Sequence, residues 1–250
     1  MRIDDLTIKI FADGADIGAM LCLATNPLIR GFTTNPTLMR KAGITDYRAF
    51  ALEVLDAITA RPVSFEVFAD DFPTMEAQAH EIASWGSNVN VKIPVTNTAG
   101  IFTGPVIQRL SAAGVAVNVT ALTTARQVRE VANLLDPATP AYISVFAGRV
   151  ADTGVDPVPV MVEALDIMAH LPKAELIWAS PRELLNVIQA DRIGCHIITV
   201  TPEILGKLGL IGKDLDEYSL ETVKMFYNDA RAASFTIQTR VTGSMGAVPA

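Results

Sequence analysis

The chain has 250 residues, of which half are hydrophobic and 19% are charged, so it can bury a large core and is not disordered. Lysine and arginine total 20 against 27 aspartates and glutamates, which gives a formal net charge of −7. An acidic chain without a basic block is a poor nucleic-acid binder. Arginines inside a cleft can still bind a small anion, because binding depends on the local field.

No feature of the sequence indicates a membrane, an exported location or a metal site. No apolar run reaches the roughly 18–20 residues that cross a bilayer, and no secretory apolar stretch follows the acidic first residues. Cys22 and Cys195 are too few for a disulfide scaffold, and the three histidines share no metal-ligand spacing. We therefore expect a cytoplasmic, globular protein that binds neither a membrane nor a metal.

Short β-rich runs alternate with segments of helical periodicity along the whole chain. The predicted strands are residues 7–11, 31–33, 63–67, 89–95, 115–119, 142–146, 176–179 and 195–200. The predicted helices between them include residues 46–60, 74–85, 99–113, 124–135 and 157–169. This alternation implies a parallel sheet with right-handed crossovers.

Two architectures satisfy this pattern, an open doubly wound sheet and a closed (β/α)₈ barrel. No GxGxxG follows the first strand, which counts against a dinucleotide-binding open sheet, and the strand number favours the barrel. We predict an α/β fold in which residues 1–250 form a single (β/α)₈ TIM barrel domain with a C-terminal helical extension. Residues 233–250 have no place in the alternation and are predicted to be a tail or an oligomer contact.

In several predicted strands the polar residues share one face and the apolar residues share the other, because successive side chains point to opposite sides. The polar faces carry Ser64, Glu66, Asn90, Lys92, Asn118, Thr120 and Ser144. In a barrel this face is the interior, whose C-terminal mouth holds the active site. Charged groups there are costly unless they meet a ligand, water or each other. The pattern therefore predicts an active site at the mouth.

Lys92 is the candidate nucleophile. It lies in an apolar run, Val91-Lys92-Ile93-Pro94, where desolvation disfavours the ammonium form and is expected to lower the lysine pKa. A free amine can then attack a carbonyl. Asp13 follows the first predicted strand, at the right height to act as a general acid or base beside Lys92, although an aspartate before a glycine is also common in turns.

Two arginines, Arg149 and Arg182, follow later strands. Ser180 followed by Pro181 suggests that a helix begins there, and the free N–H groups of a helix N-terminus favour an anion. Phosphate sites of barrels lie on the loops after the late strands. A phosphorylated carbonyl substrate fits these arginines together with Lys92.

These residues resemble the transaldolase family of class I, Schiff-base-forming barrels, over roughly residues 9–208. The motifs that carry the resemblance are Thr33-Thr34-Asn35-Pro36, Ser64-Phe65-Glu66, Val91-Lys92-Ile93-Pro94, Asn118-Val119-Thr120, Ser144 through Arg149, and Ser180-Pro181-Arg182. One of them alone is weak, but together, in family order and each at its expected strand, they are specific.

The resemblance implies transfer of a dihydroxyacetone unit from fructose 6-phosphate or sedoheptulose 7-phosphate to an aldose phosphate, in the pentose phosphate pathway. It implies that Lys92 forms the Schiff base and that Asp13 takes the proton from the C4 hydroxyl. Glu66 and Thr120 are implied to hold the water that shuttles protons. The implied substrate-binding residues are Thr34, Asn35, Asn118, Ser144, Phe146, Arg149, Ser180 and Arg182, of which the last three hold the phosphate.

The iminium is the electron sink in this chemistry, so the resemblance implies no metal or organic cofactor. Compact members of the family often form rings, so a homo-oligomer is expected.

The fructose 6-phosphate aldolase branch of the same family is the alternative, which releases free dihydroxyacetone. That branch typically carries Gln at the position of Glu66 and Tyr at that of Phe146, so both residues favour transaldolase. Pro181 and Val145 depart from the family pattern in the phosphate-binding loops. A more remote alternative is a barrel that binds sugar phosphates without catalysis.

Overall fold

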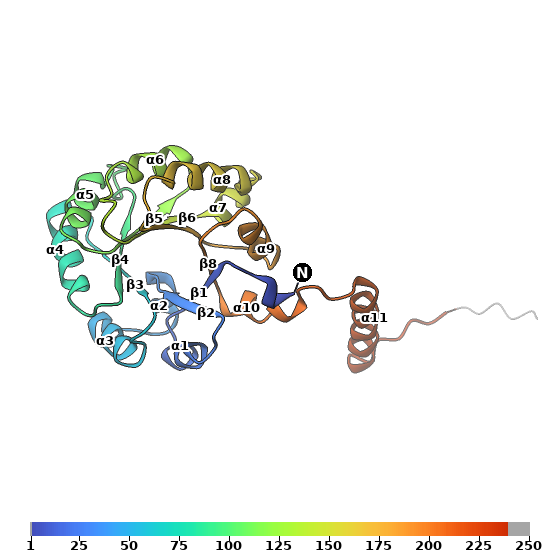
Figure 1. Cartoon of the computed structure of the whole chain (residues 1–250). Coiled ribbons are helices and arrows are strands. Elements are labelled where there is room, and N and C mark those ends of the chain that lie inside the picture. Colours follow the sequence, from blue (N-terminus) through green and yellow to red (C-terminus); the bar gives the residue numbers. More distant parts are fainter. Residues whose placement is uncertain (1, 240–250) are drawn as a thin grey trace, which may run out of the picture. The chain divides into compact units, whose positions relative to one another are not determined.

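Eight parallel strands form a closed barrel, in the computed structural model that describes residues 2–239 (Figure 1). The chain divides into two units, residues 2–209 and the part from Leu210 onward, and the barrel belongs to the first. Each strand pairs in parallel with the next along the chain, and β8 pairs with β1. The predicted (β/α)₈ barrel is therefore confirmed, and the open sheet is excluded.

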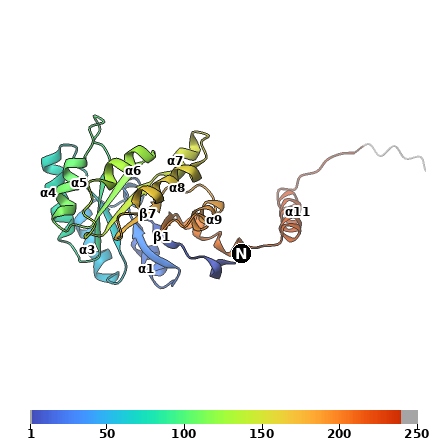
Figure 2. The same ribbon diagram turned by 45° about the horizontal axis from the view of Figure 1, so that its top comes forward.

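The helices surround the strands on the outside (Figure 2). The strands are β1 (Lys9–Asp13), β2 (Ile29–Thr33), β3 (Val63–Glu66), β4 (Val89–Pro94), β5 (Val117–Leu122), β6 (Ala141–Val145), β7 (Ala174–Trp178) and β8 (Ile197–Val200). The helices of the barrel unit are α1 (Ile17–Ala24), α2 (Pro36–Lys41), α3 (Tyr47–Ala57), α4 (Phe72–Ala83), α5 (Gly104–Ala112), α6 (Ala125–Ala132), α7 (Ala147–Asp152), α8 (Pro157–Met168), α9 (Leu185–Arg192) and α10 (Pro202–Leu205). Two short 3₁₀ turns are η1 (Ile3–Asp5) and η2 (Leu208–Leu210).

Apolar side chains fill the lower part of the barrel. Phe11, Ile177 and Ile197 form a buried cluster, and the ring of Tyr142 meets that of Phe11 edge-on with 5.7 Å between centroids. Burial of each large apolar side chain contributes roughly 1.5–3 kcal/mol. These side chains close the barrel below its C-terminal mouth, where polar strand residues such as Lys92 and Ser144 line the cavity.

The first strand begins two residues later than predicted, because its expected start is bound elsewhere. The backbone N–H groups of Thr7 and Ile8 donate to a carboxylate oxygen of Asp191, at 2.7 and 3.0 Å, and not to a sheet ladder. Asp13 consequently lies in β1 and not after it.

The helix start predicted at Ser180 and Pro181 is wrong. Helix α9 begins at Leu185, and Ser180 has a left-handed backbone with a φ of 60°, a region that non-glycine residues rarely adopt. A bend of the chain therefore follows β7, and an anion site at this position does not rest on a helix N-terminus.

The second unit contains α11 (Leu215–Ala232), which confirms the predicted C-terminal helical extension. Asp214 caps it by accepting from the backbone N–H groups of Asp216 and Glu217. Its exposed large hydrophobic residues are Leu215, Tyr218, Leu220, Val223, Met225, Phe226 and Tyr227. Of the predicted tail, residues 240–250 lie outside the described residues, and the single-domain organisation stays a prediction. Over residues 2–239, no helix combines the length and apolar character of a membrane span.

Candidate active site

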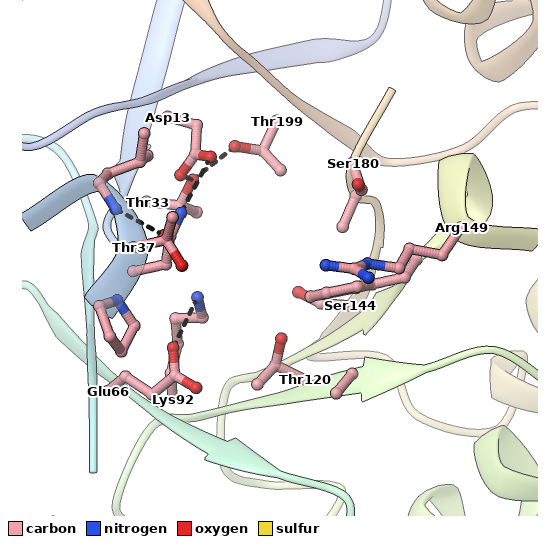
Figure 3. Close-up of a pocket in the computed structure, with 16 residues that line it drawn as sticks. Asp13, Thr33, Thr37, Glu66, Lys92, Thr120, Ser144, Arg149, Ser180 and Thr199 are labelled. Carbon is pink, nitrogen blue, oxygen red and sulfur yellow. Dashed lines mark hydrogen bonds and ion pairs between the residues drawn. The ribbon is translucent and has the colours of Figure 1, made fainter. Parts of the chain in front are cut away.

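A cavity of about 410 Å³ opens at the C-terminal ends of the strands (Figure 3). Its lining takes side chains from around the whole barrel: Asp13 from β1, Thr33 from β2, Glu66 from β3, Lys92 from β4, Thr120 from β5, Ser144 from β6, Ala179 after β7 and Thr199 from β8. Parallel strands bring these ends to one mouth. The cavity lies where the alternation of polar and apolar residues predicts the site.

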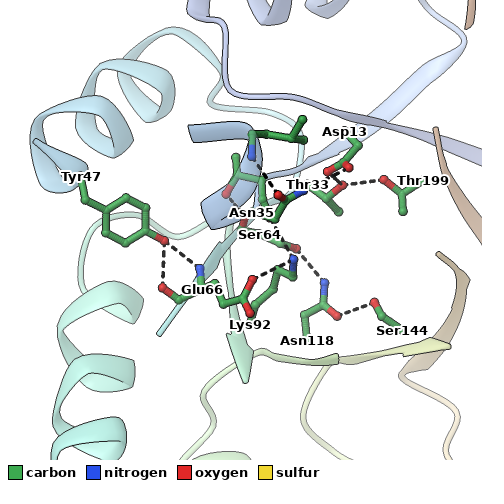
Figure 4. A network of polar contacts seen from close by, with 12 residues as sticks. Asp13, Thr33, Asn35, Tyr47, Ser64, Glu66, Lys92, Asn118, Ser144 and Thr199 are labelled. Carbon is green, nitrogen blue, oxygen red and sulfur yellow. Dashed lines mark hydrogen bonds and ion pairs between the residues drawn. The ribbon is translucent and has the colours of Figure 1, made fainter. Parts of the chain in front are cut away.

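Lys92 is buried, with 7% of its surface exposed. Its Nζ lies 3.2 Å from Oε2 of Glu66 and donates a hydrogen bond of 2.9 Å to the backbone carbonyl of Thr34. A buried ammonium requires such partners. The amine therefore stands fixed at the cavity wall with a carboxylate beside it (Figure 4).

Asp13 is held by hydroxyl and amide donors. Thr33 Oγ1 donates to Asp13 Oδ1 at 2.8 Å, and Asn35 Nδ2 donates to Oδ2 at 3.3 Å. The Thr33 hydroxyl also lies 2.5 Å from that of Thr199. Desolvation raises the pKa of the Asp13 carboxyl, and the charge of Lys92 and these hydrogen bonds offset the rise only in part. A raised pKa makes a carboxylate a stronger base, which suits it to accept and return a proton.

Asn118 and Thr34 are fully buried and lie outside the cavity lining. The Asn118 amide donates to Ser64 Oγ at 3.0 Å and its carbonyl accepts from Ser144 Oγ at 2.7 Å (Figure 4). The Thr34 hydroxyl donates to the Ser64 carbonyl at 2.9 Å. Both residues therefore act on the cavity through neighbours, Asn118 by orienting Ser144 and Thr34 by presenting its carbonyl to Lys92.

Thr120 lines the cavity, and its hydroxyl oxygen is buried with no hydrogen-bond partner within the described part of the chain. Native proteins rarely leave such a group unpaired. The next residue, Ala121, also lines the cavity and has a φ of 65°, and strained backbone of this kind often occurs at ligand sites.

The two predicted phosphate-binding arginines differ in their surroundings. Arg149 lines the cavity and forms no ion pair with any residue from 2 to 239. Arg182 does not line it: its Nε and Nη2 donate to the Asp152 carboxylate at 2.8 and 2.5 Å, and its Nη1 donates to Ser180 Oγ at 3.0 Å. The hydrogen bonds from Arg182 hold the pKa of Asp152 below its usual value. Arg182 therefore supports Ser180, while Arg149 faces the cavity.

Gly148, in α7, allows this helix to approach the backbone of Ser180 closely. A Cβ atom at this position would lie 1.6 Å from the backbone carbonyl oxygen of Ser180, and only glycine, which has no Cβ, avoids this clash. The Gly148 N–H also donates to the Ala179 carbonyl at 3.4 Å. Because Arg149 is the next residue, this contact fixes its position relative to Ser180. In Figure 3, Arg149 and Ser180 lie across the cavity from Lys92 and Asp13.

Most of the site residues named from the sequence line this cavity. They are Asp13, Asn35, Glu66, Lys92, Thr120, Ser144, Phe146, Arg149 and Ser180. Thr34, Asn118 and Arg182 lie outside its lining. Thr33, Thr37 and Thr199 also line the cavity and were not predicted as site residues. Signals for two of them were present, because Thr33 belongs to the Thr-Thr-Asn-Pro motif and Thr199 is the polar residue of an otherwise apolar strand.

The cysteines and histidines do not line the cavity. Cys195 is buried, and burial raises the pKa of its thiol to about 12. No group of three or more histidine, cysteine, aspartate or glutamate side chains among residues 2–239 is arranged to hold a metal ion.

Comparison with known proteins identifies the family of this chain. The family model described as Transaldolase/Fructose-6-phosphate aldolase matches residues 10–238. A "Probable transaldolase" of Rhodospirillum centenum is 34% identical over 203 residues, 80% of this chain and 84% of that protein. One of Dehalococcoides mccartyi is 35% identical over 199 residues, 79% and 88% of the two chains.

A solved structure supports the architecture alone. Dihydrodipicolinate synthase from Rhodopseudomonas palustris superposes with a TM-score of 0.56 at 13% identity, over 94% of this chain and 82% of that one. The family match, in contrast, spans every strand of the barrel and all of the residues around the cavity. The chain therefore belongs to the transaldolase/fructose-6-phosphate aldolase family.

Proposed function

We propose that this enzyme is a transaldolase, which transfers a dihydroxyacetone unit from a ketose phosphate to an aldose phosphate through a Schiff base on Lys92. The proposed donors are fructose 6-phosphate and sedoheptulose 7-phosphate, as in the pentose phosphate pathway. The observation that carries the proposal is the buried Lys92 amine at the cavity wall, 3.2 Å from the Glu66 carboxylate. Asp13, with its raised pKa, lines the same cavity.

Schiff-base formation begins when the neutral Lys92 amine attacks C2 of the ketose. One proton moves from the amine nitrogen to the C2 carbonyl oxygen, which becomes a hydroxyl; this hydroxyl gains a second proton and leaves as water, and an iminium remains. Glu66 is the nearest carboxylate to Nζ and relays these protons through a water molecule that the unpaired Thr120 hydroxyl helps to hold. General acid–base assistance of this kind contributes roughly 10²–10⁴-fold to the rate.

Asp13 then takes the proton of the C4 hydroxyl. The C3–C4 bond breaks, its electron pair moves into the iminium to give an enamine, and glyceraldehyde 3-phosphate leaves. The enamine attacks the aldehyde of the acceptor, Asp13 returns the proton to the new hydroxyl, and hydrolysis of the iminium frees the product and Lys92. The hydrogen bonds from Thr33 and Asn35 keep both carboxylate oxygens of Asp13 oriented for this transfer.

The phosphate of the substrate is proposed to bind Arg149 and Ser180, with Arg182 holding Ser180 in place. Arg149→Ala should raise the KM for fructose 6-phosphate by about 10–100-fold, because a hydrogen-bonded charge pair contributes roughly 1.5–3 kcal/mol. Arg182→Ala should raise it less. Steady-state kinetics with fructose, which lacks the phosphate, tests whether the loss depends on the phosphate: Arg149→Ala should leave the reaction with fructose unchanged.

The exposed Arg48, which pairs with Glu81, gives the matched control, and Arg48→Ala should behave as the wild type. An equal loss with fructose and with fructose 6-phosphate in Arg149→Ala would contradict a phosphate-binding role.

The decisive experiment measures glyceraldehyde 3-phosphate released from fructose 6-phosphate, with and without erythrose 4-phosphate. Sustained release only with the acceptor supports transaldolase. Sustained release without it, together with free dihydroxyacetone, indicates the aldolase activity that the family description also includes, and shows that Glu66 and Phe146 do not decide the branch. Absence of product and of a borohydride-stable adduct on Lys92 would contradict the proposed reaction and favour the alternative of a barrel that binds sugar phosphates without catalysis.

The enzyme is also proposed to be a cytoplasmic homo-oligomer. The exposed apolar side chains of α11, such as Val223 and Phe226, support an assembly that covers them. Sedimentation equilibrium should give a mass that is a multiple of 26.8 kDa, whereas the monomer mass would contradict the proposal. Fractionation of the native host should recover the protein with cytoplasmic markers.

A further inference from the structure

The backbone hydrogen bonds that pair β2 with β3 stop just below the candidate active site. These strands pair only at Phe32 with Val63 and at Thr33 with Ser64, and the Thr34 N–H donates to the Ser64 carbonyl at 3.3 Å. The regular alternation of a parallel ladder would next join the Glu66 N–H to the Thr34 carbonyl.

Both of those groups are bound elsewhere. The Thr34 carbonyl accepts from Lys92 Nζ at 2.9 Å, and the Glu66 N–H donates to the Tyr47 hydroxyl at 2.7 Å. The same hydroxyl donates to the Glu66 carbonyl at 3.0 Å. The Tyr47 hydroxyl thus supplies a hydrogen-bond acceptor for the Glu66 N–H and a donor for the Glu66 carbonyl, which strand β2 does not provide (Figure 4).

The ring of Tyr47 is fixed by aromatic neighbours. It meets the rings of Phe65 and Trp85 edge-on, at 6.1 and 5.4 Å between centroids, and that of Phe68 at 4.7 Å. Burial raises the pKa of the Tyr47 hydroxyl, which keeps the proton that the Glu66 carbonyl accepts. Tyr47 itself does not line the cavity, so any effect on the reaction passes through Glu66.

We propose that Tyr47 is a positioning residue: by binding both backbone groups of Glu66, its hydroxyl places the Glu66 carboxylate beside Lys92. The proposal rests on the proposed Schiff-base role of Lys92. It adds a residue from α3, outside the barrel, to the machinery that handles protons during imine formation.

Tyr47→Phe tests this, because it keeps the ring in the aromatic cluster and removes only the hydroxyl. We expect kcat to fall about tenfold, the loss that two neutral hydrogen bonds predict, while the KM for fructose 6-phosphate changes less than twofold. Tyr142→Phe is the matched control. It removes a half-buried hydroxyl from the barrel floor beside Phe11 and should leave both constants unchanged.

A double-mutant cycle separates positioning from general stability. In a Glu66→Ala background, Tyr47→Phe should have no further effect on kcat, because the group that it positions is absent. A tenfold loss in both backgrounds would overturn the inference, as would an unchanged kcat in the single variant. Thermal unfolding of each variant confirms that the barrel is folded.

Hydrogen exchange gives a readout that does not need turnover. The Glu66 amide should exchange faster in Tyr47→Phe than in Tyr142→Phe, because its acceptor is lost. An unchanged amide in an active, borohydride-trappable enzyme overturns the Tyr47 inference alone. If the wild-type enzyme forms no adduct, the proposed function is overturned, and the contact of Tyr47 with Glu66 then has no role in catalysis.

Discussion

Lys92→Met is expected to abolish the borohydride-stable adduct and to lower turnover by ~10⁴-fold or more, the scale of loss when a covalent nucleophile is removed. Methionine has a similar length and fits a buried site, but it has no amine to attack the ketose. Mass spectrometry of the trapped enzyme, alongside steady-state kinetics, measures both effects. Lys9, a strand lysine that pairs with Glu175 at 2.7 Å and lies outside the cavity lining, provides the control.

Lys9→Met should retain the adduct and the wild-type turnover. A trapped adduct on a different lysine in Lys92→Met would contradict the assignment of the nucleophile. Lys92→Met also leaves the Glu66 carboxylate without its partner, so the variant should be less stable than the wild type. Adding Glu66→Gln, which removes the unpaired charge, should restore part of the melting temperature without restoring activity.

Asp13→Ala is expected to lower turnover by roughly 10²–10⁴-fold while leaving the Schiff base on Lys92 intact. Asp13 acts after imine formation, at cleavage of the C3–C4 bond, so the covalent intermediate with fructose 6-phosphate should accumulate and be trapped in greater yield. Intact-mass analysis of the trapped enzyme measures this. Asp56→Ala, at an exposed position of α3, is the control. Full turnover in Asp13→Ala would remove Asp13 from its proposed role.

The raised pKa of Asp13 has consequences for both activity and stability. As a base it must be ionised, so the acid limb of kcat should lie above the ordinary value of 3.8. The folded state holds this proton more tightly than the unfolded state does, so the contribution of Asp13 to stability falls as pH rises through the interval between the two pKa values. Across that interval the melting temperature of Asp13→Ala should rise relative to that of the wild type. A constant difference would contradict a raised pKa.

The amino-acid sequence by itself determined the barrel and the residues that its strands carry inward. The alternation of strand and helix is a local property with its own periods, and successive residues of a strand point to opposite sides. Lys92, Glu66, Thr120 and Ser144 therefore reach the cavity as predicted. The predicted ends of a strand were less accurate where a side chain from a distant part of the sequence binds the backbone. Strand β1 starts later than predicted because the N–H groups of Thr7 and Ile8 donate to Asp191.

Only the tertiary structure decided which side chains pair inside and around the cavity. Arg182 pairs with Asp152 at the end of α7, the Thr33 hydroxyl meets that of Thr199 across the barrel seam, and the Tyr47 hydroxyl reaches the backbone of Glu66. These partners are 30, 166 and 19 residues apart in the chain. No sequence period specifies such contacts, because each depends on where the barrel closes and how a loop or helix packs against it.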